Sequence, residues 1–212
     1  KALHLMINFA KCEDSNIRQL MCEDEILLVL QIYLKKFESD YEVLFKTIKI
    51  IRFISSEPSI LNKLESIGIL PSILRLINKL IETSKPNENE EPINDLLRIL
   101  YYMSKLNSKR QEQIVLNGGI PLLIHLTKNS TKVIKKVAFP ILCHFVQTSD
   151  LTRKKLWENG GPKIFLDLID DDYYQPKILD TIALWLTFEP EEIEALLLDY
   201  QVFNKLIEVF KS

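Results

Sequence analysis

The sequence has few of the residues from which catalytic and metal sites are commonly built. Of 212 residues, five are glycine, three are histidine and three are cysteine. His4, His125 and His144 lie far apart in the sequence, and no pair of cysteines or histidines has zinc-finger spacing. The motifs Gly-x-Gly-x-x-Gly, His-Arg-Asp and Asp-Phe-Gly, which a kinase domain requires, are absent. The sequence therefore gives no reason to expect an enzyme, a bound metal or a cofactor.

Two local clusters of residues could suggest a metal site or a catalytic site, but neither has the pattern that such a site requires. The run Asp170–Asp172 lacks the alternation and the glycine of a calcium-binding loop. We interpret it as a turn whose aspartates cap the following helix. Cys143 and His144 are adjacent in a helical pattern, where neighbouring side chains diverge by about 100°. We therefore do not expect them to form a nucleophile pair.

The chain also lacks an excess of positive charge and a long apolar run. Its formal net charge is −2, which argues against general nucleic-acid binding. No apolar run reaches the length of about 18 residues that a membrane span needs, and no signal peptide is visible. Cys12, Cys22 and Cys143 have no regular spacing and suit buried positions in a reducing compartment. We expect a cytoplasmic chain that does not bind nucleic acid and has no membrane span.

The few glycines all occur in one recurring context, just before a proline and an apolar run. The three segments are residues 67–74, 117–124 and 159–166. Pro121 follows Pro71 by 50 residues, and Gly161 follows Gly119 by 42. Removing about eight residues of the polar stretch 84–92, which we interpret as an inserted loop, restores a period near 42. Weaker copies of the apolar run begin at Ile26 and Phe203. The period lies in the range of HEAT and armadillo repeats.

Each period contains the pattern of three helices. A short helix ends at the glycine, which permits the positive φ of a sharp turn. A proline in the first turn opens a second helix, and a third, longer helix follows, as over 93–106 and 131–146. The fold class is therefore all-α. We expect an armadillo/HEAT-like right-handed superhelical solenoid of about five repeats, the first and last incomplete, forming a single domain over residues 1–212. The start at Lys1, without methionine, suggests a fragment of a longer chain.

Three further segments narrow the resemblance within the armadillo proteins. They are residues 104–121, residues 139–144 with a proline inside a long helix, and residues 166–183. Over roughly residues 40–210 the chain resembles the non-catalytic armadillo region of the kinases of mitotic exit and septation in fungi. It is similar also to the corresponding region of plant MAP-kinase-kinase-kinase epsilon. The resemblance implies a module of a Ser/Thr kinase that acts at the spindle pole body under a Ras-like GTPase.

The third helices, which line the concave face of armadillo proteins, carry a charge bias. The segments 43–54, 96–107 and 131–146 together hold eight lysines and arginines and no acid. Aligned by repeat, Arg52, Tyr102 and His144 stand where peptide-carrying armadillo proteins hold a ladder of asparagines. The residues that replace the asparagines suit an acidic or phosphorylated segment of a scaffold protein. The candidate peptide- and phosphate-binding residues are Arg52, Arg98, Tyr102, Lys136, His144, Lys49, Lys105, Lys109 and Arg110.

Other interpretations of these surfaces are open. The alternative is that the basic stripe is only a solvated face, since lysine commonly covers exposed helix surface. The apolar C-terminal end would support self-association as a homodimer or an autoregulatory contact. A surface for the Ras-like GTPase is a further alternative. Among the aromatic residues, we expect Tyr101, Phe139, Phe145, Trp157 and Trp185 in the core, and Tyr173 and Tyr174 exposed in a turn.

Overall fold

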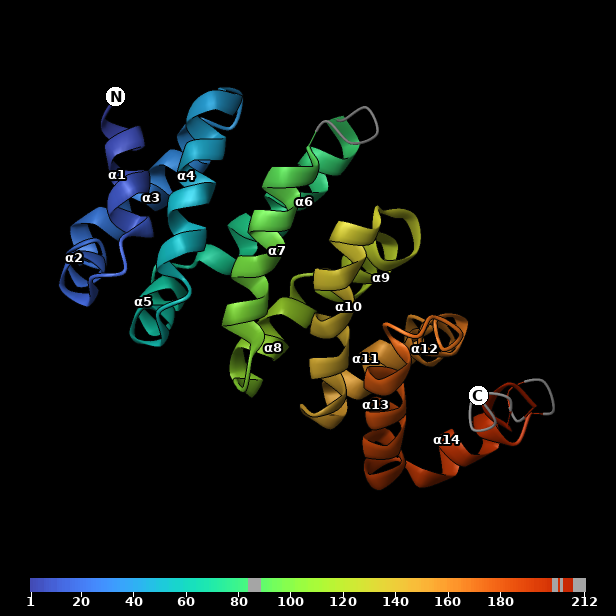
Figure 1. Cartoon of the computed structure of the whole chain (residues 1–212). Coiled ribbons are helices and arrows are strands. Elements are labelled where there is room, and N and C mark those ends of the chain that lie inside the picture. The colour runs from blue at the N-terminus through green and yellow to red at the C-terminus, as the bar shows by residue number, and fades with distance from the viewer. Residues whose placement is uncertain (84–88, 200–201, 203, 208–212) are drawn as a thin grey trace.

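The computed structural model describes residues 1–83, 89–199, 202 and 204–207, and within these it contains helices and no strand. Five helices lie side by side in one row, which we call the third helices (Figure 1). They are α1 (Ala2–Lys11), α4 (Tyr41–Ile54), α7 (Glu90–Ser104), α10 (Lys132–Val146) and α13 (Gln175–Phe188). Each packs against the next in the row. We call their exposed surface the third-helix face.

The remaining helices complete the repeats. The second helices are α3 (Asp24–Lys36), α6 (Ile69–Thr83), α9 (Gly119–Asn129) and α12 (Gly161–Asp167). Figure 1 shows α6 and α9 behind the row of third helices. The first helices are α2 (Ser15–Leu20), α5 (Leu61–Ser66) after the 3-10 turn η1 (Pro58–Ile60), α8 (Ser108–Leu116), α11 (Asp150–Glu158) and α14 (Pro190–Leu197). This order confirms the all-α solenoid predicted from the sequence.

The glycines end the first helices as predicted. Gly68, Gly118 and Gly160 have φ of 69°, 79° and 76°, which an L side chain adopts only with strain. The second glycine of each pair has another role. A Cβ on Gly119 would lie 2.7 Å from the carbonyl oxygen of Ile114. The second helix can therefore pack this closely on the first only because the residue has no side chain.

The core is continuous along the chain and consists mainly of leucine and isoleucine. The face of α6 that turns inward buries eight of its fifteen residues. Because apolar residues recur at helical spacing, each helix presents one stripe to its neighbours and a polar stripe to solvent. Within the described residues, no helix has both the length and the hydropathy of a membrane span.

The inserted loop is shorter at its C-terminal end than predicted. The third helix α7 begins at Glu90, so residues 90–92 belong to this helix, while 84–88 lie outside the described residues. Glu91 and Asp95 thereby join the third-helix face. The sequence pattern predicted a helix that starts at residue 93, so Glu91 was not counted as part of it. The charge comparison covered only residues 96–107, so Asp95 was not counted either.

Two aromatic residues differ from the sequence expectation. Trp157 was expected in the core but is 36% exposed, because it packs edge-on against Trp185 and turns its other side outward. Tyr174 was expected to be exposed but is buried against Phe139, with ring centroids 5.2 Å apart. Tyr173 is exposed, as predicted.

The turn before α13 also differs in detail. The carboxylate of Asp171 accepts a hydrogen bond from the backbone N–H of Tyr173, which closes a turn, and Asp170 pairs with Lys205. The residue at the N-cap of α13 is Tyr174, so the aspartates stabilise the turn and do not cap the helix.

Candidate functional site

The polar stripe of α4 is partly neutralised by α7. Lys49 forms an ion pair with Glu91, and Arg52 lies 3.6 Å from the carboxylate of Asp95. The hydrogen bond from Lys49 holds the pKa of Glu91 below its ordinary value. Burial raises the pKa of Asp95 and outweighs the nearby Arg52. These two cations therefore already have anionic partners from the neighbouring repeat.

Lys109 and Arg110 lie on α8, a first helix, and both contact Glu65 of α5. The Arg110 side chain is buried, with Nε 2.9 Å from the Glu65 carboxylate. Lys109 is exposed and lies 3.2 Å from the same carboxylate. Burial opposes the ionisation of Glu65, but the hydrogen bonds from Arg110 and Lys109 prevail and lower its pKa. The buried arginine holds two repeats together, which explains its presence without a ligand.

His144 is present as a neutral group on α10. Burial, followed by the fields of Lys177 and Lys105, lowers its pKa to about 4. Its ring packs against Tyr101 at 5.3 Å, and its Nδ1 lies 3.5 Å from the Ser104 hydroxyl. At neutral pH this residue supplies a hydrogen-bonding ring and no positive charge.

Three cations near the middle of the row form no ion pair among the described residues. They are Arg98 of α7, Lys105 at the C-cap of that helix, and Lys177 of α13, although the charge of Arg98 also acts on the nearby carboxylate of Asp95. Lys105, at the end of α7, and Lys177, on α13, lie on opposite sides of α10, yet both act electrostatically on His144. We call Arg98, Lys105 and Lys177 the basic cluster. Tyr102, half-buried on the same stripe of α7, accompanies it.

Lys177 was missed by the sequence reasoning. Its helix also contains Asp180, so the two charges show no basic bias. The electrostatic effect of Lys177 on His144 crosses between repeats, so no spacing within one helix could have revealed it. Lys136 has an aromatic partner instead of a carboxylate. Its ammonium lies 4.3 Å from the ring centroid of Tyr173, and this contact joins α10 to the turn before α13.

Comparisons with known proteins show which proteins this chain is similar to. No family model matches it. It is 30% identical over 187 residues to the cytokinesis protein sepH of Aspergillus niger, covering 88% of this chain and 14% of that protein. It is 31% identical over 214 residues to MAP3K epsilon protein kinase 1 of Brassica napus, covering 100% of this chain and 16% of that protein. Cell division control protein 7 of Schizosaccharomyces pombe is 29% identical over 207 residues, covering 97% and 19%.

The chain is homologous to one segment of these proteins. It spans less than a fifth of the length of each of the three. Among solved structures, a computationally designed armadillo repeat protein for modular peptide recognition has a TM-score of 0.81 at 18% identity, over 98% of this chain and 83% of that one. Another design, in complex with the peptide (KR)4, has a TM-score of 0.73 at 18% identity, over 99% and 90%. The fold is the armadillo fold.

Proposed function

We propose that the third-helix face docks an acidic or phosphorylated segment of a scaffold protein. The observation that carries this proposal is the basic cluster, whose three cations come from α7, its C-cap and α13 and form no ion pair among the described residues. Arginine binds phosphate through two parallel charge-assisted hydrogen bonds, and lysine adds a point charge. Arg98 is the residue most suited to hold the phosphate, with Tyr102 packing against the bound segment.

The charge of the cluster also selects against other ligands. The solved relative noted above holds a basic peptide, (KR)4. Here Arg98, Lys105 and Lys177 would repel such a peptide. In addition, the alignment by repeat puts Arg52, Tyr102 and His144 at the positions where peptide-carrying armadillo proteins have asparagines. An anionic segment is attracted instead, and the attraction speeds encounter and weakens as salt is added.

The homologous proteins support a proposal about the parent protein. We propose that this module belongs to a Ser/Thr kinase of septation or mitotic exit and localises it at the spindle pole body. The kinase domain would lie elsewhere in the parent chain. Lys49, Arg52 and Lys136, which already have partners, would border the docked segment, and Lys109 and Arg110 would not contact it.

The test is a binding measurement with a phosphorylated scaffold peptide. We expect Arg98→Glu to cost 2 kcal/mol or more, about thirtyfold in Kd, since truncating charge-paired groups at interfaces costs about 2–5 kcal/mol. The matched control is Lys154→Glu, an exposed lysine of α11. A loss of less than about 1 kcal/mol for Arg98→Glu would reject the third-helix face as the docking site.

Self-association is a second candidate, favoured by an exposed apolar row on α3. Leu28, Val29 and Ile32 are 50%, 44% and 47% exposed. A second copy would cover this row, giving a mass that rises with concentration and does not respond to phosphate. Binding of the Ras-like GTPase would instead show as a dependence on its bound nucleotide.

A further inference from the structure

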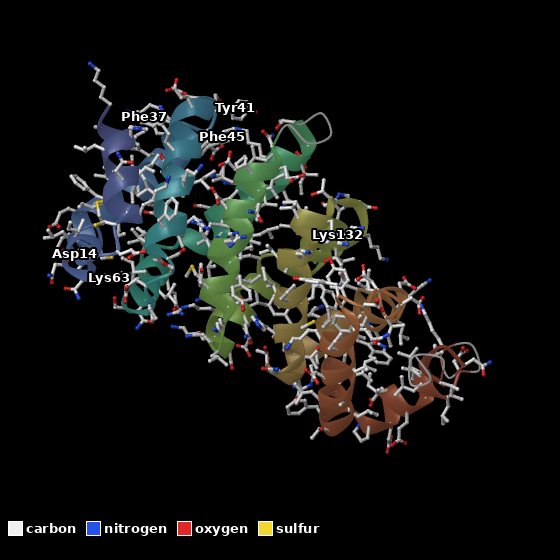
Figure 2. The ribbon with its side chains drawn as sticks, in the orientation of Figure 1. Asp14, Phe37, Tyr41, Phe45, Lys63 and Lys132 are labelled. Atoms are coloured by element: carbon white, nitrogen blue, oxygen red, sulfur yellow. The ribbon has the colours of Figure 1, made fainter. Side chains whose placement is uncertain are left out.

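A second cationic site lies away from the basic cluster, between α9, α10 and α12. A pocket of about 360 Å³ is lined there by Thr127, Lys128, Lys135 and Lys163, together with Asp167 and two apolar residues. Figure 2 labels Lys132, which precedes Lys135 on α10 by three residues. Because α9 and α12 belong to neighbouring repeats, the pocket forms where two repeats meet α10. Its volume is within the range of about 300–1,000 Å³ seen for small-ligand sites.

The three lysines are not neutralised. Lys128, Lys135 and Lys163 form no ion pair or hydrogen bond through their side chains among the described residues. The carboxylate of Asp167 is likewise unpaired there. The pocket thus holds three positive charges and one negative charge, and the excess favours an anion.

Thr127 supplies the observation that points to a ligand. Its side chain is 1% exposed, and its hydroxyl has no hydrogen-bond partner among the described residues. The hydroxyls of Thr47, Thr181 and Thr187 each donate to the backbone carbonyl four residues earlier in their helices. Thr127 sits in a helix as they do but does not make this bond. A buried hydroxyl without a partner costs stability, on the order of 1–3 kcal/mol.

The neighbouring repeat shows that folding does not require a hydroxyl here. Thr127 lies six residues after Pro121, and the residue six after Pro71 in α6 is Ile77. Ile77 is fully buried in the core. The same place in the repeat is thus filled equally well by an apolar side chain. Filling this position in the core therefore does not account for the hydroxyl of Thr127.

We propose that this pocket binds the phosphate of a phosphorylated serine or threonine in a protein segment. The phosphate would accept a hydrogen bond from the Thr127 hydroxyl and pair with the three lysines. Asp167 would accept an N–H from the backbone beside the phosphorylated residue, and it disfavours a second phosphate. Ile164 and Leu168 give an apolar wall for the methyl group of phosphothreonine. The site is distinct from the basic cluster and does not depend on it.

The test uses N-acetyl-phosphothreonine-N-methylamide, a probe too small to occupy the third-helix face as a docked segment would. In a two-dimensional amide NMR titration we expect saturable shifts at Thr127, Lys128 and Lys163, and none with the unphosphorylated compound. Thr127→Val should keep the fold and weaken the phosphate-dependent binding about fivefold, as for one lost hydrogen bond. Lys163→Gln should weaken it roughly tenfold.

Two matched controls isolate the effect. Thr47→Val removes another buried threonine hydroxyl, and Lys154→Gln removes another exposed lysine charge; both should leave probe binding unchanged. Shifts confined to the basic cluster, or equal affinity of Thr127→Val and wild type, would overturn the proposal. Tighter binding of inositol 1,4-bisphosphate than of the probe would also overturn it, by assigning the pocket to a lipid headgroup.

Discussion

Arg110 and Lys109 contact the same carboxylate from different environments, which makes their removal a direct test of the structure. The Arg110 side chain is 5% exposed, whereas that of Lys109 is 78% exposed; Glu65 is 15% exposed. Arg110→Ala leaves the Glu65 charge nearly buried with only a solvated lysine beside it. Breaking a buried pair in this way costs about 3–5 kcal/mol. Because Lys109 remains, we expect about 3 kcal/mol.

Lys109→Ala removes the exposed partner and should cost no more than about 1 kcal/mol, as exposed pairs do. Urea unfolding followed by circular dichroism measures both variants. Since solenoid repeats can open separately, hydrogen exchange should also show whether α5 and α8 lose protection together. Equal costs for the two variants, or a cost below about 1 kcal/mol for Arg110→Ala, would contradict the buried pair.

The pH dependence gives an independent check on the same pair. The pKa of Glu65 is lowered in the folded chain, so its contribution to stability is complete above the ordinary value of 4.5 and is lost as pH falls through the lower, folded value. The stability difference between wild type and Arg110→Ala should therefore be constant from pH 7 to about 5 and shrink in more acidic solution.

Three further predictions concern single residues. Gly119→Ala should lower stability by about 1–3 kcal/mol in urea unfolding, since its Cβ would press on the Ile114 carbonyl; an unchanged midpoint would contradict this contact. The His144 ring should titrate by NMR near pH 4, so stability should fall as pH decreases from 6.5, the ordinary pKa, to about 4. Cys143, whose thiol pKa burial raises to about 12, should resist alkylation at pH 8 until urea is added.

The repeat and its helices could be predicted because their signals are local. Positive φ at Gly118 is a property of one residue, and the proline that follows at Pro121 is favoured in the first turn of a helix. The start of α7 was predicted too late, at residue 93, because that prediction also relied on local composition. Glu90 and Glu91 are polar and resemble the preceding loop, although acids in the first turn are favoured by the helix dipole.

The candidate site could be predicted only in part. Arg98 and Lys105 were identified from the basic charge bias of one predicted third helix. The neutralisation of Lys49 by Glu91 was not, since these residues are 42 positions apart. That separation is close to one repeat, so pairs one period apart are the signal that would have found it.

The amino-acid sequence alone thus determined the period, the helix boundaries at the glycines and the all-α class, because backbone conformation depends on neighbouring residues. Stacking of the repeats decided which charges are free. It placed Arg110 against Glu65, left Lys105 and Lys177 facing one histidine, and buried the hydroxyl of Thr127. Coulomb energy and desolvation depend on distances and burial across repeats, and these are fixed only when the helices pack.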